Sequence, residues 1–417
     1  MRVAILTNEF PPHIYGGAGV HVEYLTRELV GLNGVDVDVY CFGDQNLLEG
    51  NLTVRGVEAG PASKVQDPRH AKIFGTLSRN LRTAGLVHGA DIVHCHTWYS
   101  HWAGCLVKQL TGAKLVLTTH SLEPHRPWKV EQLGTAYQLS AWLERTAYKN
   151  ADGVVAVSPS MKSDVHALYG VSHDRIRVIP NGIDPDEYRP TFDKGVLEKY
   201  GVDATVPFVL FVGRITRQKG IIHIVDAMEY LHPGIQVVLA AGAPDTPDIE
   251  REMTRRVQAA RKRSDRKIVW ISDMLPRADI IALYTHAAVF ACPSVYEPFG
   301  IINLEAMACE TAVVASNVGG IPTVVKDGET GILVPVDTDG QKPRDAGAFA
   351  RSLADGINQL MADPTKRAAF GKNGRERVLK KFSWRAIATQ TLAYYESLIS
   401  TSHSRSKTSP RCVSGTL

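Results

Sequence analysis

The fold is decided by residues 288–305, which read AVFACPSVYEPFGIINLE. The apolar run at 288–293 is typical of a buried strand, and Gly300 is expected to open a helix. Glu297 then lies on the turn after the strand, beside the free backbone N–H groups of that helix. A carboxylate that can hold sugar hydroxyls, next to a helix end that can hold phosphate, suits a nucleotide sugar. For one glutamate alone, a solvated acid at a loop edge is the alternative.

Short apolar strands alternate with helical patterns along almost the whole chain. Twelve strands are expected, at 3–7, 36–41, 92–96, 114–119, 153–157, 176–179, 208–212, 236–240, 268–271, 288–292, 312–315 and 332–334. Helices are expected between them, for example at 20–29, 137–148, 249–262 and 278–285. This alternation implies parallel sheets with helices on both faces. Twelve strands are too many for one such sheet, so we expect an α/β protein with two doubly wound, Rossmann-like domains.

The turn signals Pro, Asn-Gly and Asp-Pro crowd into residues 178–185 and mark the expected domain boundary. We expect an N-terminal domain at 1–180 and a second domain at 181–383. A final helix at 384–400 should pack back on the body, and the Ser/Thr-rich basic tail at 401–417 should be disordered. In open α/β sheets, ligands bind outside the carboxyl ends of the strands. The site should therefore lie in the cleft between the two domains.

The composition is that of an ordinary globular protein, with 417 residues, 44% hydrophobic and 22% charged. Arg405, Lys407 and Arg411 of the tail supply three of the formal +4 charges. The body is thus nearly neutral, which argues against nucleic acid or a membrane surface as the main partner. The six cysteines form no C-x-x-C pair and are typical of reduced thiols. With no long apolar run either, we expect a cytoplasmic protein without stable membrane association.

Three groups of residues lie at or just after the ends of strands of the first domain. Gly16 and Gly17 can bring bare backbone N–H groups against a diphosphate, although a tight turn explains them equally well. His96 and Trp98 follow the strand at 92–96, where a pocket wall with Trp98 against a sugar ring competes with a packed strand end. A zinc site on the His-x-His pattern lacks a third and a fourth ligand at metal-site spacing. His120 ends the next strand and is either structural or a hydrogen-bond partner of a sugar hydroxyl.

A fourth group opens the second domain. Arg214 leaves the end of the strand at 208–212, and Lys219 stands at the start of the next helix. Two cations five residues apart around a glycine-containing loop can clamp a leaving diphosphate. A solvated basic turn is the alternative.

Together these residues resemble the retaining glycosyltransferases of family 4, which have the two-domain GT-B fold. The resemblance runs from the first strand to about Ile399. The sequences of segments 15–22, 94–98 and 119–124 further resemble those of the actinobacterial-type glycogen synthases, which use ADP-glucose to make α-1,4-glucan or maltose 1-phosphate. The resemblance to family 4 is carried most strongly by the Gly-Gly pair, the histidine, the two cations and the E-x7-E arrangement: Gly16, Gly17, His120, Arg214, Lys219, Glu297 and Glu305.

The resemblance implies a role for each matched residue. Glu297 would hold hydroxyls of the donor glucose, and Glu305 the ribose of the nucleotide. The two cations would neutralise the β-phosphate as it leaves, aided by N–H groups of Gly300 and Ile301. The glycine pair would approach the diphosphate from the other domain, and His120 would contact the glucose 6-hydroxyl.

The chemistry expected is transfer of glucose to a hydroxyl acceptor with retention at the anomeric carbon. No second acid is placed for a covalent glycosyl-enzyme, so we expect same-face attack with the departing phosphate accepting the acceptor's proton. The cationic pair replaces a divalent ion, so no metal or other cofactor is expected.

The acceptor is left open between an α-glucan, a sugar phosphate, and sucrose-type, lipid or cell-wall acceptors. Ile14 stands where plant and enteric relatives carry lysine, a departure that bears on the acceptor and leaves the donor chemistry untouched. Thr323 replaces a glutamate that is frequent in the family. A nucleotide-sugar epimerase and a non-catalytic sugar-nucleotide sensor are the rival classes, and the oligomeric state is not readable.

Overall fold

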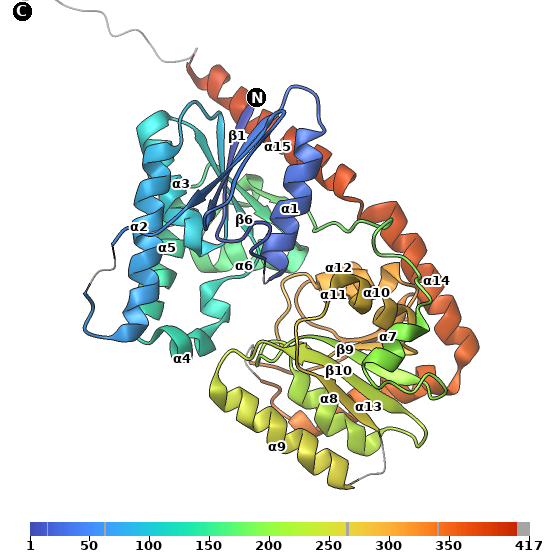
Figure 1. The fold of residues 1–417 in the computed structure, drawn as a ribbon. Coiled ribbons are helices and arrows are strands. Elements are labelled where there is room, and N and C mark those ends of the chain that lie inside the picture. The colour runs from blue at the N-terminus through green and yellow to red at the C-terminus, as the bar shows by residue number, and fades with distance from the viewer. Residues whose placement is uncertain (15, 62–63, 264–266, 340–341, 407–417) are drawn as a thin grey trace, which may run out of the picture.

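The computed structural model describes residues 1–14, 16–61, 64–263, 267–339 and 342–406. They form two α/β domains that lie one above the other in Figure 1. The first contains an eight-stranded sheet in the order β3-β4-β2-β1-β5-β6-β7-β8, in which only β3 is antiparallel to its neighbour. Its strands are β1 (Arg2–Leu6), β2 (Asp36–Phe42), β3 (Asn46–Glu49), β4 (Leu52–Val57), β5 (Ile92–His96), β6 (Lys114–Thr119), β7 (Gly153–Ala156) and β8 (Ile176–Val178).

Helices cover both faces of this sheet. Their ends carry the expected chemistry: Ser158 accepts a hydrogen bond from the backbone N–H of Met161 at one start, and Gly170 closes that helix in the left-handed region. The helices are α1 (Gly17–Val30), α2 (Ala71–Leu86), α3 (Trp98–Thr111), α4 (Val130–Leu133), α5 (Ala136–Asn150) and α6 (Pro159–Tyr169).

The second domain has a six-stranded sheet, all parallel, in the order β11-β10-β9-β12-β13-β14. Its strands are β9 (Phe208–Arg214), β10 (Gln236–Gly242), β11 (Ile268–Ile271), β12 (Val289–Cys292), β13 (Ala312–Ser316) and β14 (Gly331–Val334). The helices are α7 (Lys194–Lys199), α8 (Ile221–Ala227), α9 (Pro247–Arg263), α10 (Arg277–His286), α11 (Ile301–Ala308), α12 (Ile321–Val324), α13 (Ala346–Ala362) and α14 (Pro364–Lys381).

The chain crosses between the domains twice, and the two crossings touch. The backbone N–H of Ile183 donates to the carbonyl of Phe382 at 2.7 Å. The last helix, α15 (Trp384–Ser406), then returns to the first domain and runs beside α1 (Figure 1). Its Trp384, Ile387 and Tyr395 are buried in the same cluster as the apolar side chains of β1 and α1.

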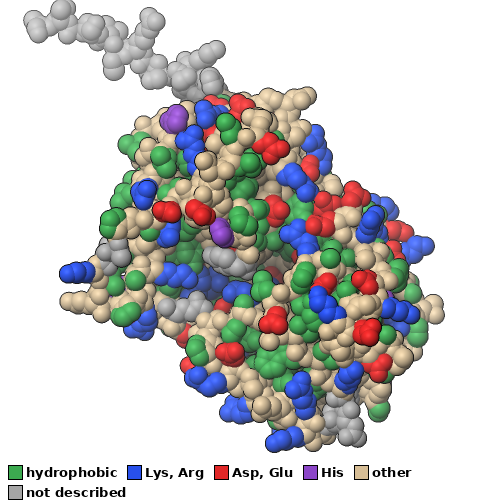
Figure 2. Space-filling model, in the orientation of Figure 1, with side chains coloured by type: hydrophobic (Ala, Val, Ile, Leu, Met, Phe, Trp, Pro, Cys, Tyr) green, Lys and Arg blue, Asp and Glu red, His purple; other side chains and the backbone are tan. Residues whose placement is uncertain are grey.

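The expected architecture, two Rossmann-like domains of the GT-B type facing across a cleft with a C-terminal helix packed back, is confirmed. The surface is hollowed between the two lobes, and lysine and arginine side chains lie along the hollow (Figure 2). Two strands were not predicted, because β3 is fully exposed and β4 is only partly buried, so neither carries an apolar run. The prediction of disorder from residue 401 is wrong for 401–406, which continue α15, and residues 407–417 lie outside the described chain.

Candidate active site

Glu297 lies where the sequence predicts, on the turn between β12 and α11. Gly300 caps α11 with a φ of +101°, a conformation that glycine adopts without strain. The backbone N–H of Gly320 donates to the carbonyl oxygen of Glu297 at 2.8 Å. A Cβ on Gly319 would overlap that same oxygen, so the turn of Glu297 is held by close backbone contact.

The two predicted cations each face a carboxylate. The Nζ of Lys219 lies 2.7 Å from Oε2 of Glu297, and both side chains are largely buried. The Nη1 of Arg214 lies 2.9 Å from Oδ1 of Asp245, with 41% of the arginine side chain exposed. Lys219 therefore connects the carboxylate that is expected to hold sugar with the loop that is expected to hold phosphate.

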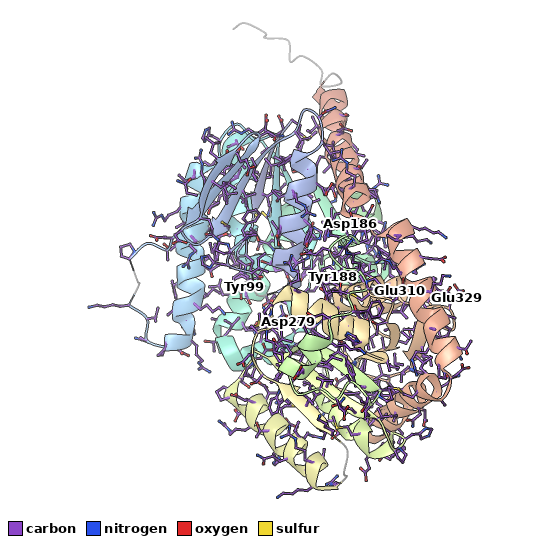
Figure 3. All side chains as sticks on the ribbon, turned by 45° about the vertical axis from the view of Figure 1, so that its right-hand side comes forward. Tyr99, Asp186, Tyr188, Asp279, Glu310 and Glu329 are labelled. Atoms are coloured by element: carbon purple, nitrogen blue, oxygen red, sulfur yellow. The ribbon has the colours of Figure 1, made fainter. Side chains whose placement is uncertain are left out.

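Glu305 projects from the second turn of α11 and is fixed by two tyrosines. The hydroxyl of Tyr284 donates to Oε2 at 2.9 Å, and that of Tyr188 to Oε1 at 3.4 Å. Burial raises the pKa of Glu305. Tyr188, labelled in Figure 3, comes from the segment that follows the first crossing between the domains. The two glutamates of the E-x7-E pattern thus have separate partners and separate environments.

The glycine loop of the first domain approaches α11 of the second. A Cβ on Gly17 would lie 3.4 Å from Cδ1 of Ile301, the first residue of that helix. The backbone N–H of Gly16 donates to Oε2 of Glu9 at 2.9 Å. Glu9 is 5% exposed, and its carboxylate lies against the glycine loop. The structure thus brings the two predicted diphosphate-binding elements together across the cleft.

Histidines dominate the first-domain wall. Nδ1 of His96 and Nε2 of His120 are 3.0 Å apart, and His120 alone of the two is partly exposed. His21 donates through Nδ1 to Oδ1 of Asn181 at 2.6 Å. His94 bonds Thr118 through Nε2 and Tyr395 through Nδ1.

These imidazoles are neutral at physiological pH because burial penalises their charged form. Burial lowers the pKa of His21 to about 4 and that of His94 to about 3. Burial and the neighbouring histidines hold the pKa of His96 and that of His120 well below the usual range. These histidines can therefore hydrogen-bond a sugar without adding positive charge to that of Arg214 and Lys219.

Trp98 does not form the predicted pocket wall. The side chain is 4% exposed and packs with Ile73, Leu133 and Leu143 in a separate apolar cluster. His96 is fully buried as well and reaches the cleft only through His120. Trp98 therefore fits the alternative of a packed strand end, and His96 lies behind His120, away from the surface of the cleft.

Contacts between the domains flank the site. The hydroxyl of Ser158 donates to the carbonyl of Pro298 at 2.8 Å, beside Glu297. On another side, Arg277 of α10 bonds the hydroxyl of Tyr24 at 3.1 Å and pairs with Glu187 at 2.7 Å. Any opening of the cleft must break or bend these contacts.

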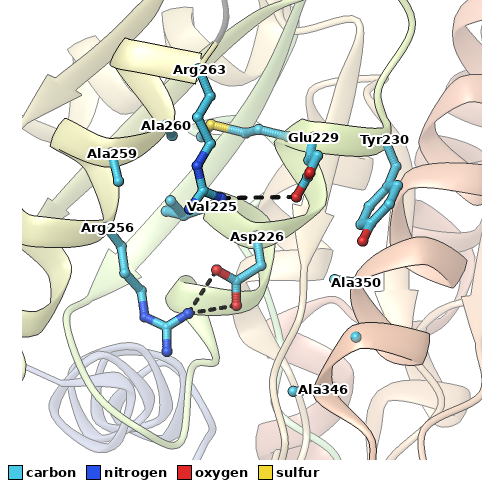
Figure 4. A pocket seen from close by; sticks show the side chains of 12 residues that line it. Val225, Asp226, Glu229, Tyr230, Arg256, Ala259, Ala260, Arg263, Ala346 and Ala350 are labelled. Carbon is cyan, nitrogen blue, oxygen red and sulfur yellow. Dashed lines mark hydrogen bonds and ion pairs between the residues drawn. The ribbon is translucent and has the colours of Figure 1, made fainter.

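A pocket of about 530 Å³ lies elsewhere, among α8, α9 and α13 (Figure 4). Arg256 spans it with hydrogen bonds of 2.7 and 2.8 Å to the two carboxylate oxygens of Asp226. It contains none of the predicted site residues, and both of its arginines already face carboxylates, Arg256 that of Asp226 and Arg263 that of Glu229. We therefore place the reaction in the interdomain cleft.

Two doubly wound domains that face each other across a cleft have the architecture of a GT-B glycosyltransferase. Residues 15–187 match the family described as Glycosyltransferase Family 4, and residues 196–377 match Glycosyl transferases group 1. The chain belongs to the family 4 glycosyltransferases and is a hexosyltransferase.

Relatives match along nearly the whole chain. It is 47% identical to the alpha-maltose-1-phosphate synthase of Mycolicibacterium smegmatis over 404 residues, 95% of this chain and 99% of that protein. The sucrose-phosphate synthase of Thermosynechococcus elongatus superposes with a TM-score of 0.78 at 28% identity, over 96% of this chain and 99% of that one. HepE of Anabaena, solved with UDP and glucose, shares the fold with a TM-score of 0.74 at 20% identity, over 95% and 100%. No described helix is both long and apolar enough to cross a membrane.

Several residues of the site escaped the sequence analysis. Asp245 follows the end of β10, and Glu9 follows the end of β1, so the strand-end rule was a usable signal for both. His21, Asn181 and Tyr188 carry no such signal, because they lie in a helix or in the segment that joins the domains.

Proposed function

We propose that the enzyme transfers glucose from ADP-glucose to an α-glucan or to glucose 1-phosphate, with retention at the anomeric carbon. The observation that carries the donor side is the 2.7 Å pair of Lys219 and Glu297 at the start of α11, opposite the glycine loop. The acceptor side rests on the whole-chain similarity to an alpha-maltose-1-phosphate synthase. The specific choice of ADP-glucose rests on the family resemblance.

In this reaction the bond between the anomeric carbon and the β-phosphate oxygen breaks, and its electron pair stays on the phosphate. The acceptor hydroxyl forms the new bond on the same face, and its proton passes to the departing phosphate. Lys219 and Arg214 stabilise the negative charge that develops on the leaving phosphate. Stabilisation of this kind by preorganised donors is usually the largest single contribution to the rate of an enzyme reaction. Glu297 orients the glucose, and Glu305 holds the ribose.

Binding of the donor must release the cations from their present partners. A diphosphate entering between Gly17 and Ile301 would compete with Glu297 for Lys219 and with Asp245 for Arg214. The glucose hydroxyls would then donate to the freed oxygens of Glu297. His120 would accept or donate a hydrogen bond at the glucose 6-hydroxyl. The domains are expected to adjust about the touching crossings at 180–185 and 382–384.

Turnover is proposed to need no divalent ion, because two side-chain cations face the leaving group. Activity should survive EDTA and should not rise with added magnesium. Loss of turnover in EDTA with recovery in magnesium would refute this part of the mechanism.

One matrix of assays tests the whole proposal. ADP-glucose and UDP-glucose are each offered with glycogen, glucose 1-phosphate and fructose 6-phosphate, and nucleotide release is followed. We expect release with ADP-glucose and with at least one of the first two acceptors. An α-anomeric product by nuclear magnetic resonance tests retention. Release only with UDP-glucose would overturn the donor assignment, and release only with fructose 6-phosphate would overturn the acceptor.

We also propose that the enzyme is located in the cytoplasm and that it takes part in the synthesis of glycogen or another α-glucan. The five described cysteines are free, which agrees with a reducing compartment. Deletion of the gene in its host should lower stored α-glucan, and fractionation should leave the activity in the cytoplasm.

A further inference from the structure

Three histidines from three different elements converge at the first-domain wall. They are His21 of α1, His96 at the end of β5 and His120 after β6. One ring nitrogen from each lies within 4.8 Å of those of the other two. The third member was invisible to spacing along the sequence, because the fold brings α1 against the ends of β5 and β6.

Hydrogen bonding leaves a lone pair free at this point. Because Nδ1 of His21 donates to Asn181, its Nε2 carries the lone pair, and that buried atom has no hydrogen-bond partner among the described residues. A buried acceptor of this kind is costly unless something binds it. Nδ1 of His96 and Nε2 of His120 share one hydrogen bond, and an ion bound to both nitrogens would take the place of the proton between them.

The spacing suits a small metal ion. Zinc binds imidazole nitrogen at 2.0–2.1 Å in tetrahedral geometry, which separates two ligand nitrogens by about 3.3 Å. Nδ1 of His96 and Nε2 of His120 are already 3.0 Å apart. Asn181 provides the outer contact that fixes the tautomer of His21, as the partners of zinc-binding histidines do.

We propose that His21, His96 and His120 bind one Zn²⁺ ion, with the fourth position open toward the cleft, and that this ion inhibits the enzyme. Neutral imidazoles favour Zn²⁺ over Mg²⁺, so the site does not conflict with metal-independent turnover. The bound ion would take the single lone pair of His120 at Nε2, so Nδ1 would carry the proton and could no longer accept a hydrogen bond from a sugar hydroxyl. Inhibition is thus expected to come from loss of a substrate contact.

Metal binding itself is the test, and it needs no substrate. Full-length protein without a histidine tag is freed of metal with a chelator and then titrated with Co²⁺, whose visible absorption reports tetrahedral coordination. Calorimetry with Zn²⁺ measures stoichiometry and affinity. We expect one ion per chain. His21→Ala and His96→Ala should each weaken binding at least tenfold, and Asn181→Ala about 10- to 100-fold.

The matched control is His166→Ala. His166 and His173 stack on the surface with ring centroids 4.1 Å apart and are the obvious adventitious zinc site. Unchanged affinity in this variant supports the proposal, and loss of binding in it overturns the proposal. Unchanged affinity in both His21→Ala and His96→Ala overturns it as well.

If those two variants do not fold, the partly exposed His120→Ala together with Asn181→Ala carries the test, and normal zinc affinity in both refutes the site. Zinc should also inhibit the wild-type enzyme reversibly, with EDTA restoring the rate. Because binding is measured without nucleotide sugar, failure of this site would leave the proposed function intact.

Discussion

The two walls of the cleft differ in their electrostatics, because one carries charged side chains and the other carries neutral ones. The second-domain wall pairs full charges, Lys219 with Glu297 and Arg214 with Asp245. The first-domain wall carries the neutral imidazole of His120 with the buried His96 behind it, and burial and the neighbouring histidines keep both rings from taking a second proton. In the proposed reaction this difference divides the work, because the second domain would stabilise the charge of the leaving nucleotide and the first would hydrogen-bond a neutral sugar.

The largest effect on activity is expected when a cation is removed from the second-domain wall. Lys219→Ala should lower kcat by ~10²-fold or more, by analogy with loss of one oxyanion-stabilising donor. Arg214→Ala should have a similar effect on kcat. Steady-state kinetics with saturating acceptor measures both, and a near-normal kcat in either variant would refute the assignment.

Lys219→Ala also strips the partner from the buried Glu297, so its fold must be checked by circular dichroism. Lys219→Arg is the control. It keeps the charge beside Glu297 but changes its shape, so it should recover part of the lost rate.

The next largest effect should come from moving Glu297 without changing it. Gly319→Ala places a Cβ on the carbonyl oxygen of Glu297 and should lower activity by up to about 10²-fold, because a misplacement of about 1 Å can cost that much. Gly34→Ala is the control, since Gly34 shares the positive φ but has no atom within 4 Å of that Cβ. Equal activities in the two variants would show that close approach at Glu297 does not matter.

A smaller effect is expected on the neutral wall. His120→Ala should lower kcat/KM by roughly tenfold, the value of one or two neutral hydrogen bonds. A donor that lacks the 6-hydroxyl should lower the wild-type rate similarly and should add little to the variant. Full additivity of the two changes would show that His120 does not contact that hydroxyl.

The neutral wall also makes stability depend on pH. Burial lowers the pKa of His21 to about 4 and those of His94 and His101 to about 3, and it holds the pKa of His96 and that of His120 well below the usual range. The unfolded chain therefore binds protons that the folded chain excludes. Stability from these groups is therefore present above pH 6.5 and is lost as the pH falls below it. Glu144 opposes the trend, because its pKa is raised to about 8 by burial and the folded state holds its proton.

Urea unfolding at pH 7 and pH 5 measures the balance, and we expect a lower free energy of unfolding at pH 5. His101→Leu should reduce the slope by about 1.4 kcal/mol per pH unit, since neither ring nitrogen of His101 has a hydrogen-bond partner among the described residues that an apolar side chain would lose. The exposed His88→Ala should leave the slope unchanged. A stability that is flat or rises toward pH 5 would contradict the contrast.

The residues of the second-domain wall could be predicted from the sequence. For the first-domain wall, the sequence predicted single residues but not the cluster that they form. Glu297, Arg214 and Lys219 lie at strand ends within short local motifs, so periodicity and turn chemistry place them. The first-domain cluster depends on α1, β5 and β6 meeting in space, and no local pattern reports such a meeting. Trp98 was misplaced for a related reason, because its position after a strand does not say which way its ring packs.

The same limit applies to the fold. The alternation of strands and helices was enough for two Rossmann-like domains, since each buried strand carries its own apolar run. The strands β3 and β4 escaped because their stability comes from pairing at the sheet edge. Residues 401–406 read as a polar tail, and α15 extends through them all the same.

The return of α15 has a consequence for how the protein is made. The hydroxyl of Tyr394 accepts the backbone N–H of Val154, and Tyr395 bonds the ring of His94, so the last helix completes a core whose other members are synthesised hundreds of residues earlier. During synthesis on the ribosome, the part of the first domain that α15 covers stays exposed until the second domain has been translated and the C-terminus has emerged. A transcript cut short before Trp384 would encode both sheets and still yield an unfinished N-terminal domain.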